Sequence, residues 1–155
     1  MRADVPKGIK MKINIKKLDE NAKIPTYGTD FSAGADLYAL ADSQVTVGGG
    51  ETVLMHTGIA MEIPTGYVGL VFARSGLATK KNLAPANKVG VIDADYRGEI
   101  MVALHNHGIT PQTVENGECI AQIAIVPFLK AEFFECDELS DTVRGVGGFG
   151  STGKK

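Results

Sequence analysis

The chain has 155 residues, which suffices for a single domain with a sizeable core. Its 44% hydrophobic and 22% charged residues are typical of a globular protein and exclude a largely disordered one. The formal net charge of −2, without a stripe of Lys and Arg, argues against nucleic acid as a partner. No apolar run approaches the length of a membrane span and residues 1–10 form a polar N-terminal extension, so we expect no membrane partner and a cytoplasmic location.

Short alternating or β-branched stretches recur along the chain and predict strands. These stretches are residues 11–15, 52–55, 59–63, 67–72, 100–104, 120–126 and 131–134. Turn-forming residues, such as the glycines at 48–50, separate them so closely that little room remains for long helices. The pattern predicts an all-β fold, a jelly-roll-like β-sandwich, over residues 11–142.

Residues 74–79 interrupt the alternation, and their composition predicts one short helix. This helix would begin at Arg74, Ser75 and Gly76, whose guanidinium, hydroxyl and amide donors together suit phosphate oxygens. An Arg beside a helix start is, however, more often part of a surface ion pair. The residues alone leave both interpretations open.

Asp93 and Asp95 follow the apolar residues 89–92, which predicts that they emerge from the end of a buried strand into a tight turn. Next to surroundings of low dielectric constant, Asp93 could serve as a general base. The alternative is that both aspartates cap the turn. The sequence does not decide between these two roles.

The C-terminal tail, residues 143–155, is rich in glycine and too poor in apolar residues to pack as a strand. It partly matches a dinucleotide fingerprint and a Walker A motif, but both motifs require a following helix. Successive glycine N–H groups can nevertheless converge on an anion. We therefore expect a mobile tail that closes on a phosphate, the alternative being a flexible tail without a role.

Side chains within the tail fit this interpretation. Arg144, Ser151 and Thr152 would complete a cradle around phosphate groups, beside the amide of Gly150. Phe149 stands among glycines and would bury its ring by stacking on a partner such as a nucleobase. The tail is thus predicted to bind a nucleotide.

Five segments, in this order, resemble the five motifs of the trimeric dUTP diphosphatase (dUTPase) family. They are residues 33–39 (AGADLYA), 73–78 (ARSGLA), 90–99 (GVIDADYRGE), 117–122 (GECIAQ) and the C-terminal tail. The resemblance spans nearly the whole chain from residue 11. It implies Mg²⁺-dependent hydrolysis of dUTP to dUMP and diphosphate by a homotrimer with sites shared between subunits. Such an activity would limit uracil incorporation into DNA and supply dUMP for dTMP synthesis.

The resemblance also implies roles for individual residues. Asp93 would be catalytic, activating the water that attacks the α-phosphorus, and Tyr96 would pack under the deoxyribose. A hairpin would form the uracil pocket from Asn87, Gly90, Val91, Ile92 and Met101. The phosphate chain would be bound by Arg74, Ser75, Gly76 and Gln122, with Arg144, Phe149, Gly150, Ser151 and Thr152 closing over the nucleotide. Mg²⁺ would be carried by the triphosphate and would contact Asp36 through water.

One residue departs from the family pattern, because Cys119 stands where many relatives carry Arg. We expect this change to affect subunit packing rather than phosphate binding, since Gln122 is retained. A dCTP deaminase shares the expected fold, but such enzymes usually lack the complete C-terminal glycine motif. A nucleotide-binding module without catalysis is a further alternative, which the presence of Asp93 disfavours.

Overall fold

The computed structural model describes residues 11–148, which form twelve strands and one helix. The predictions for residues 1–10 and for Phe149, Gly150, Ser151 and Thr152 lie outside the described residues. The strands are β1 (Asn14–Lys17), β2 (Thr26–Tyr27), β3 (Ala35–Tyr38), β4 (Val45–Val47), β5 (Thr52–Met55), β6 (Ile59–Glu62), β7 (Tyr67–Phe72), β8 (Leu83–Pro85), β9 (Gly90–Ile92), β10 (Val102–Asn106), β11 (Gln112–Val114) and β12 (Cys119–Pro127). The helix is α1 (Ser75–Lys81).

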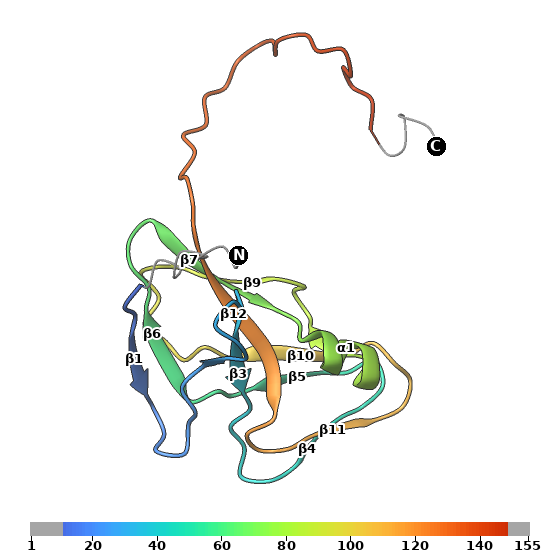
Figure 1. Cartoon of the computed structure of the whole chain (residues 1–155). Helices are drawn as coiled ribbons and strands as arrows, with labels where there is room; N and C mark the ends of the chain where they lie inside the picture. Colours follow the sequence, from blue (N-terminus) through green and yellow to red (C-terminus); the bar gives the residue numbers. More distant parts are fainter. Residues whose placement is uncertain (1–10, 149–155) are drawn as a thin grey trace, which may run out of the picture.

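The strands form four sheets (Figure 1). The largest has the order β2-β3-β12-β7-β9, and every neighbouring pair in it is antiparallel. A second sheet has the order β5-β10-β8, and two further pairs join β1 to β6 and β11 to β4. The prediction of an all-β fold with one short helix is confirmed, whereas the jelly-roll topology stays a prediction.

The core lies on one face of the five-stranded sheet and continues into the smaller sheets. Along β7 and β12 the apolar side chains alternate, so that Val71 and Ile123 point inward and pair across the two strands. β10 alternates in the same way and buries Val102 and Leu104. Burying such a side chain stabilises the fold by about 1.5–3 kcal/mol. Because successive side chains of a strand point to opposite faces, the alternating apolar pattern specifies which face is covered.

Helix α1 confirms the prediction for residues 74–79 and extends it to Lys81. Its one buried residue is Leu77, which joins the core. The helix ends at Asn82, whose φ of 55° is left-handed and lets its N–H bond back to the carbonyl of Leu77. At the other end Arg74 is extended and makes no side-chain cap.

Two predicted strands, 52–55 and 67–72, coincide with β5 and β7. The predicted strand at 131–134 is wrong, because these residues are not in a strand, pair with none of the described strands and include Phe133, which is 93% exposed. After Pro127 the chain leaves the body as an extended arm, residues 128–148 (Figure 1). In the described part of the chain, no helix is long and apolar enough to span a membrane.

Candidate functional site

Three of the predicted site residues meet where β3, β12 and the end of β7 lie side by side. Gln122 on β12 pairs with Asp36 on one side and with Phe72 on the other. Arg74 follows β7, and its Nη1 lies 2.9 Å from Oδ1 of Asp36. Nε2 of Gln122 donates to the carbonyl of Ala73 at 2.9 Å. The ion pair considered for Arg74 is therefore present, and its partner is itself a predicted site residue.

Cys119, the first residue of β12, contacts the same ion pair. Its Sγ lies 3.6 Å from Oδ2 of Asp36. Burial, together with the negative charge of Asp36, raises the pKa of the Cys119 thiol above its ordinary value of 9.0. The thiol therefore stays protonated at neutral pH and donates to a carboxylate that is only 9% exposed. Asp36 is thus held by a cation on one oxygen and by a thiol near the other.

A pocket of about 300 Å³ opens beside α1. It is lined by Arg74, Gly76, Leu77, Lys80, Lys81, Glu118 and Cys119. Lys81 is paired with Glu118, its Nζ lying 2.7 Å from Oε1, and Arg74 is paired with Asp36, so among the described residues Lys80 is the lining cation without an ion pair. Ser75 and Gly76 are exposed in the first helical turn, where N–H groups lack helical acceptors. The pocket offers the donors that phosphate oxygens accept.

Residues 87–101 carry the other predicted site residues of the body. β9 pairs with β7, whereas β10 pairs with β5 and β8, so the two strands belong to different sheets. The predicted hairpin is therefore wrong: residues 93–101 cross from one sheet to another. The sequence pattern of two strands around a turn cannot distinguish these arrangements, because both give the same alternation.

The residues predicted to line a base pocket lie on both sides of this crossing. Asn87 covers Gly90, since a Cβ at Gly90 would lie 3.4 Å from Nδ2 of Asn87. Val91 is 62% exposed, whereas Ile92 and Met101 are half-buried. The Asn87 amide and the backbone edge of β9 thus lie near Val91 and Ile92, an arrangement that suits a planar polar ring.

Asp93 directly follows β9 and is exposed. The prediction that a buried strand precedes it is wrong, because β9 is an edge strand and Val91 on it is mostly exposed. The turn is closed by the carbonyl of Asp93, which accepts the N–H of Tyr96 at 3.2 Å, so the aspartate side chain does not cap it. Within residues 11–148 the Asp93 carboxylate makes no hydrogen bond or ion pair and is free to bind a water or a ligand.

Tyr96 folds back over the chain that follows it. Its hydroxyl donates to the carbonyl of Glu99 at 3.0 Å. A Cβ at Gly98 would overlap the hydroxyl and ring of Tyr96, so this close approach requires glycine. These two contacts place the hydroxyl end of the Tyr96 ring against residues 98–99.

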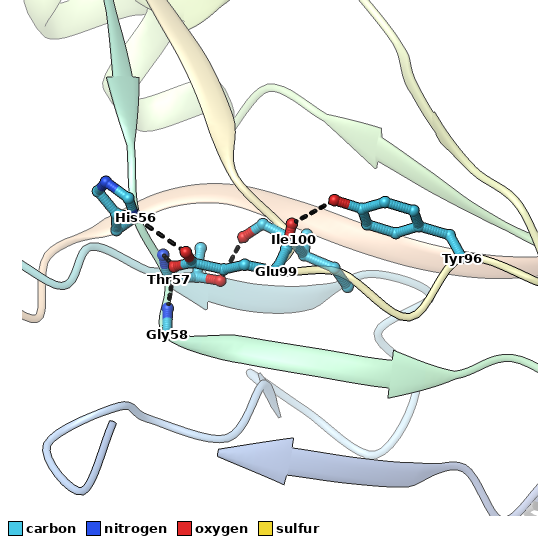
Figure 2. Close-up of polar contacts among 6 residues, drawn as sticks. All are labelled: His56, Thr57, Gly58, Tyr96, Glu99 and Ile100. Carbon is cyan, nitrogen blue, oxygen red and sulfur yellow. Dashed lines mark hydrogen bonds and ion pairs between the residues drawn. The ribbon is translucent and has the colours of Figure 1, made fainter. Parts of the chain in front are cut away.

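The Glu99 side chain ties this crossing to the β5–β6 connection (Figure 2). Its Oε1 accepts the N–H groups of Gly58 at 2.8 Å and Thr57 at 3.1 Å, and its Oε2 lies 2.9 Å from Nδ1 of His56. Although burial acts to raise it, the pKa of Glu99 is lowered from 4.5 because these groups stabilise the carboxylate. The sequence offers no signal for this contact, since the residues are far apart in the chain.

The two groups of site residues do not meet within one chain. The pairing of β9 with β7 runs from Ile92–Gly69 at one end to Gly90–Val71 at the other, so Asp93 lies one residue beyond the first end and Arg74 three residues beyond the second. At ~3.3 Å per residue the Cα atoms of Asp93 and Arg74 are roughly 15–20 Å apart. Among the described residues, no hydrogen bond or ion pair joins the two groups, and none of residues 87–101 lines the pocket beside α1.

A family model described as dUTPase matches residues 20–153, most of the chain. The chain belongs to the dUTPase family. A relative named deoxyuridine 5′-triphosphate nucleotidohydrolase from Desulfitobacterium hafniense is 51% identical over 146 residues, covering 94% of this chain and 97% of the relative. The dUTPase motifs identified in the sequence thus belong to a match that extends along nearly the whole chain.

Solved dUTPase structures share the fold. The dUTPase of Staphylococcus bacteriophage 80alpha with dUPNHPP has a TM-score of 0.85 and 29% identity, covering 94% of this chain and all of that one. The D95N mutant dUTPase of S. aureus phage phi11, described with a structural Mg(II) ion, has a TM-score of 0.75 and 26% identity, covering 83% of this chain and 98% of that one.

The C-terminal arm carries one predicted site residue, Arg144. Arg144 contacts its own segment, where its Nε donates to the carbonyl of Gly147 at 2.7 Å.

Between residues 11 and 148 no three His, Cys, Asp or Glu side chains are grouped to hold a metal ion. Asp36, the residue predicted to contact Mg²⁺ through water, is bound by Arg74 and Cys119.

A larger pocket of about 600 Å³ borders the crossing of residues 93–101 only at Glu99. Its walls include His56, Glu99, Asp19 and Asp42, together with apolar residues such as Leu54. None of the predicted dUTPase site residues within residues 11–148 lines it, and no motif in the sequence points to it.

Proposed function

We propose that this chain hydrolyses dUTP to dUMP and diphosphate by attack of water on the α-phosphorus, with Asp93 as the general base. The observation that carries the proposal is the exposed Asp93 carboxylate, which has no protein partner among residues 11–148, in a chain of the dUTPase family. A carboxylate without a partner can accept the proton of an attacking water. The name of the Desulfitobacterium relative supports the same substrate.

In this proposal the base and the sugar bind along residues 87–101. Asn87 and the backbone at Gly90 would read the edge of uracil, with Val91, Ile92 and Met101 packing around the ring. A site whose buried groups pair only with uracil rejects cytosine strongly, because the wrong base leaves polar groups without partners. Tyr96 would pack under the deoxyribose and exclude a 2′-hydroxyl.

The phosphate chain would bind beside α1. The ion pair with Asp36 occupies one nitrogen of Arg74, and a guanidinium has five N–H donors, so others remain for phosphate oxygens. Ser75, Gly76 and Gln122 would add further donors. Asp36 therefore orients Arg74 in addition to contacting, through water, a Mg²⁺ ion carried by the substrate. When bound, Mg²⁺ would neutralise the charge of the triphosphate.

We further propose a homotrimer whose sites combine residues 87–101 of one copy with the Arg74 pocket of another and the tail of a third. The separation of the two groups within one chain supports this arrangement. The arm supports it as well, because Leu129 and Phe133 are 97% and 93% exposed in the single chain. Burying each of these side chains against another copy would stabilise the assembly by about 1.5–3 kcal/mol.

The test is diphosphate release by the purified chain with Mg²⁺, using dUTP, dCTP, dTTP and UTP. We expect dUTP to be hydrolysed at least about a hundredfold more efficiently than the others. Deamination of dCTP would support the deaminase instead, and tight binding of dUTP without turnover would support a binding module. Size-exclusion chromatography with light scattering, expected to give three copies, tests the assembly.

A further inference from the structure

The crossing between β9 and β10, residues 93–101, carries Asp93 and Tyr96 and contains no strand. Its orientation must therefore come from other contacts. Most of those to the rest of the protein lie at its C-terminal end, at Glu99 and Ile100. The N–H of Ile100 donates to the carbonyl of Ile59 at 2.9 Å, and its carbonyl accepts the Thr57 hydroxyl.

The Glu99 carboxylate provides the side-chain part of this anchor. All three of its donors come from consecutive residues, His56, Thr57 and Gly58, which connect β5 to β6. The Glu99 side chain is only 19% exposed. Hydrogen bonds from N–H groups to an ionised carboxylate are stronger than hydrogen bonds to a neutral acceptor. Figure 2 shows these donors on one side of Glu99 and Tyr96 on the other.

The main chain of Glu99 is in turn the acceptor that fixes Tyr96. The Tyr96 hydroxyl donates to the Glu99 carbonyl, and the ring lies against Gly98 without room for a Cβ. The carboxylate therefore sets the position of the carbonyl, and the carbonyl sets the position of the aromatic ring. No other hydrogen bond of the Tyr96 side chain is present within residues 11–148.

We propose that Glu99 is a positioning residue for Tyr96, and that it thereby determines how strongly the site rejects a ribose. This inference rests on the proposed function, in which Tyr96 packs under the sugar. A ring held by a single hydrogen bond follows any shift of its acceptor, and displacements of about 1 Å are enough to change catalytic discrimination. Loss of the anchor would open space for a 2′-hydroxyl.

The experiment compares wild type with Glu99→Ala, Glu99→Gln and the control Glu51→Gln. Glu51 also accepts a backbone N–H, that of Gly48 at 3.1 Å, but lies in the β4–β5 turn outside the site. The readout is the ratio of kcat/KM for dUTP to kcat/KM for UTP. A purely structural role would lower both values equally and leave the ratio unchanged.

We expect Glu99→Ala to lower this ratio about tenfold and Glu99→Gln about threefold, since Gln keeps one acceptor oxygen but loses the charge. Glu51→Gln should keep the wild-type ratio. A folded Glu99→Ala enzyme with the wild-type ratio would overturn the proposal. Should Glu99→Ala not fold, an unchanged ratio in folded Glu99→Gln would overturn it equally. A wild type without preference for dUTP would instead refute the proposed sugar filter and function.

Discussion

Asp93 and Glu99 are two carboxylates in the same crossing with opposite surroundings. Asp93 is exposed and has no protein partner in the described chain, whereas Glu99 is largely buried and accepts three hydrogen bonds. The first arrangement leaves a carboxylate available to a substrate or water, and the second fixes it as part of the scaffold. Their environments therefore assign them different roles.

Replacing Asp93 with Asn should remove the proposed base without changing the shape of the loop. Because the carboxylate makes no contact in the described chain, we expect an unchanged melting temperature and a kcat lowered about 10²- to 10⁴-fold. Asp95→Asn, an exposed neighbour, is the matched control and should retain activity. An Asp93→Asn enzyme with the wild-type kcat would remove Asp93 from the mechanism.

The environment of Glu99 predicts a dependence of stability on pH. Its pKa in the folded protein lies below the ordinary 4.5, so the ionised carboxylate stabilises the fold above pH 4.5. This contribution is lost as the pH falls below 4.5 and through the lower folded pKa. Urea unfolding at about pH 7 and about pH 4 should show a larger loss of unfolding free energy in wild type than in Glu99→Gln. Equal losses would mean that the Glu99 charge does not contribute.

At the scale of elements, the site depends on how β3, β12 and β7 bring their side chains into one row. Gly34, just before β3, lies against Gln122, and a Cβ there would overlap Oε1 of Gln122. Gln122 in turn bonds the carbonyl of Ala73, next to Arg74. Gln122 therefore links Gly34 to the start of α1.

Gly34→Ala should displace the Gln122 side chain and weaken phosphate binding. The loss of about one hydrogen bond corresponds to a rise in KM for dUTP of roughly tenfold. Gly28→Ala is the control, because a Cβ at Gly28 would meet only the Ser32 hydroxyl at an ordinary 3.8 Å. If both variants show the wild-type KM, Gln122 does not contribute to binding.

The elements also show what the sequence could and could not predict. Strands 52–55 and 67–72 were predictable because each is an alternating or continuously apolar stretch that follows turn-forming residues. The stretch 131–134 also contains apolar residues, but it has no partner strand within residues 11–148. The pairing of β9 with β7 and the contacts of Glu99 with residues 56–58 join segments far apart in the chain. A local sequence pattern cannot reveal such contacts. The motifs predict the site residues, and those among residues 11–148 lie in two groups or on the arm.

At the scale of the molecule, the single chain leaves apolar surface exposed along the arm. Leu129, Phe133 and Leu139 are each more than four-fifths exposed, which is unfavourable for a chain acting alone. The proposed trimer would cover these side chains and bring the separated groups of site residues together. Assembly and activity are thus expected to be coupled.

Deleting residues 143–155 tests the proposed role of the tail. Because the core ends before these residues, the truncated chain should remain a folded trimer that binds the nucleoside end weakly. Its kcat/KM for dUTP should fall about a hundredfold or more, since the donors closing on the phosphates are gone. Removal of only Lys154 and Lys155 serves as the control. An intact kcat/KM after the full deletion would contradict the proposed role of the tail.

The central claim, a dUTP-hydrolysing site shared between copies, is tested most directly by mixing two inactive variants. The Asp93→Asn and Arg74→Ala chains are coexpressed in equal amounts. Random assembly then gives trimers of which three in four contain both variants. In each mixed trimer, one of the three sites has both an intact Asp93 and an intact Arg74. Activity should therefore recover to about a quarter of wild type, because each intact site takes Asp93 from one copy and Arg74 from another. No recovery in mixed trimers, with both variants folded, would contradict the account.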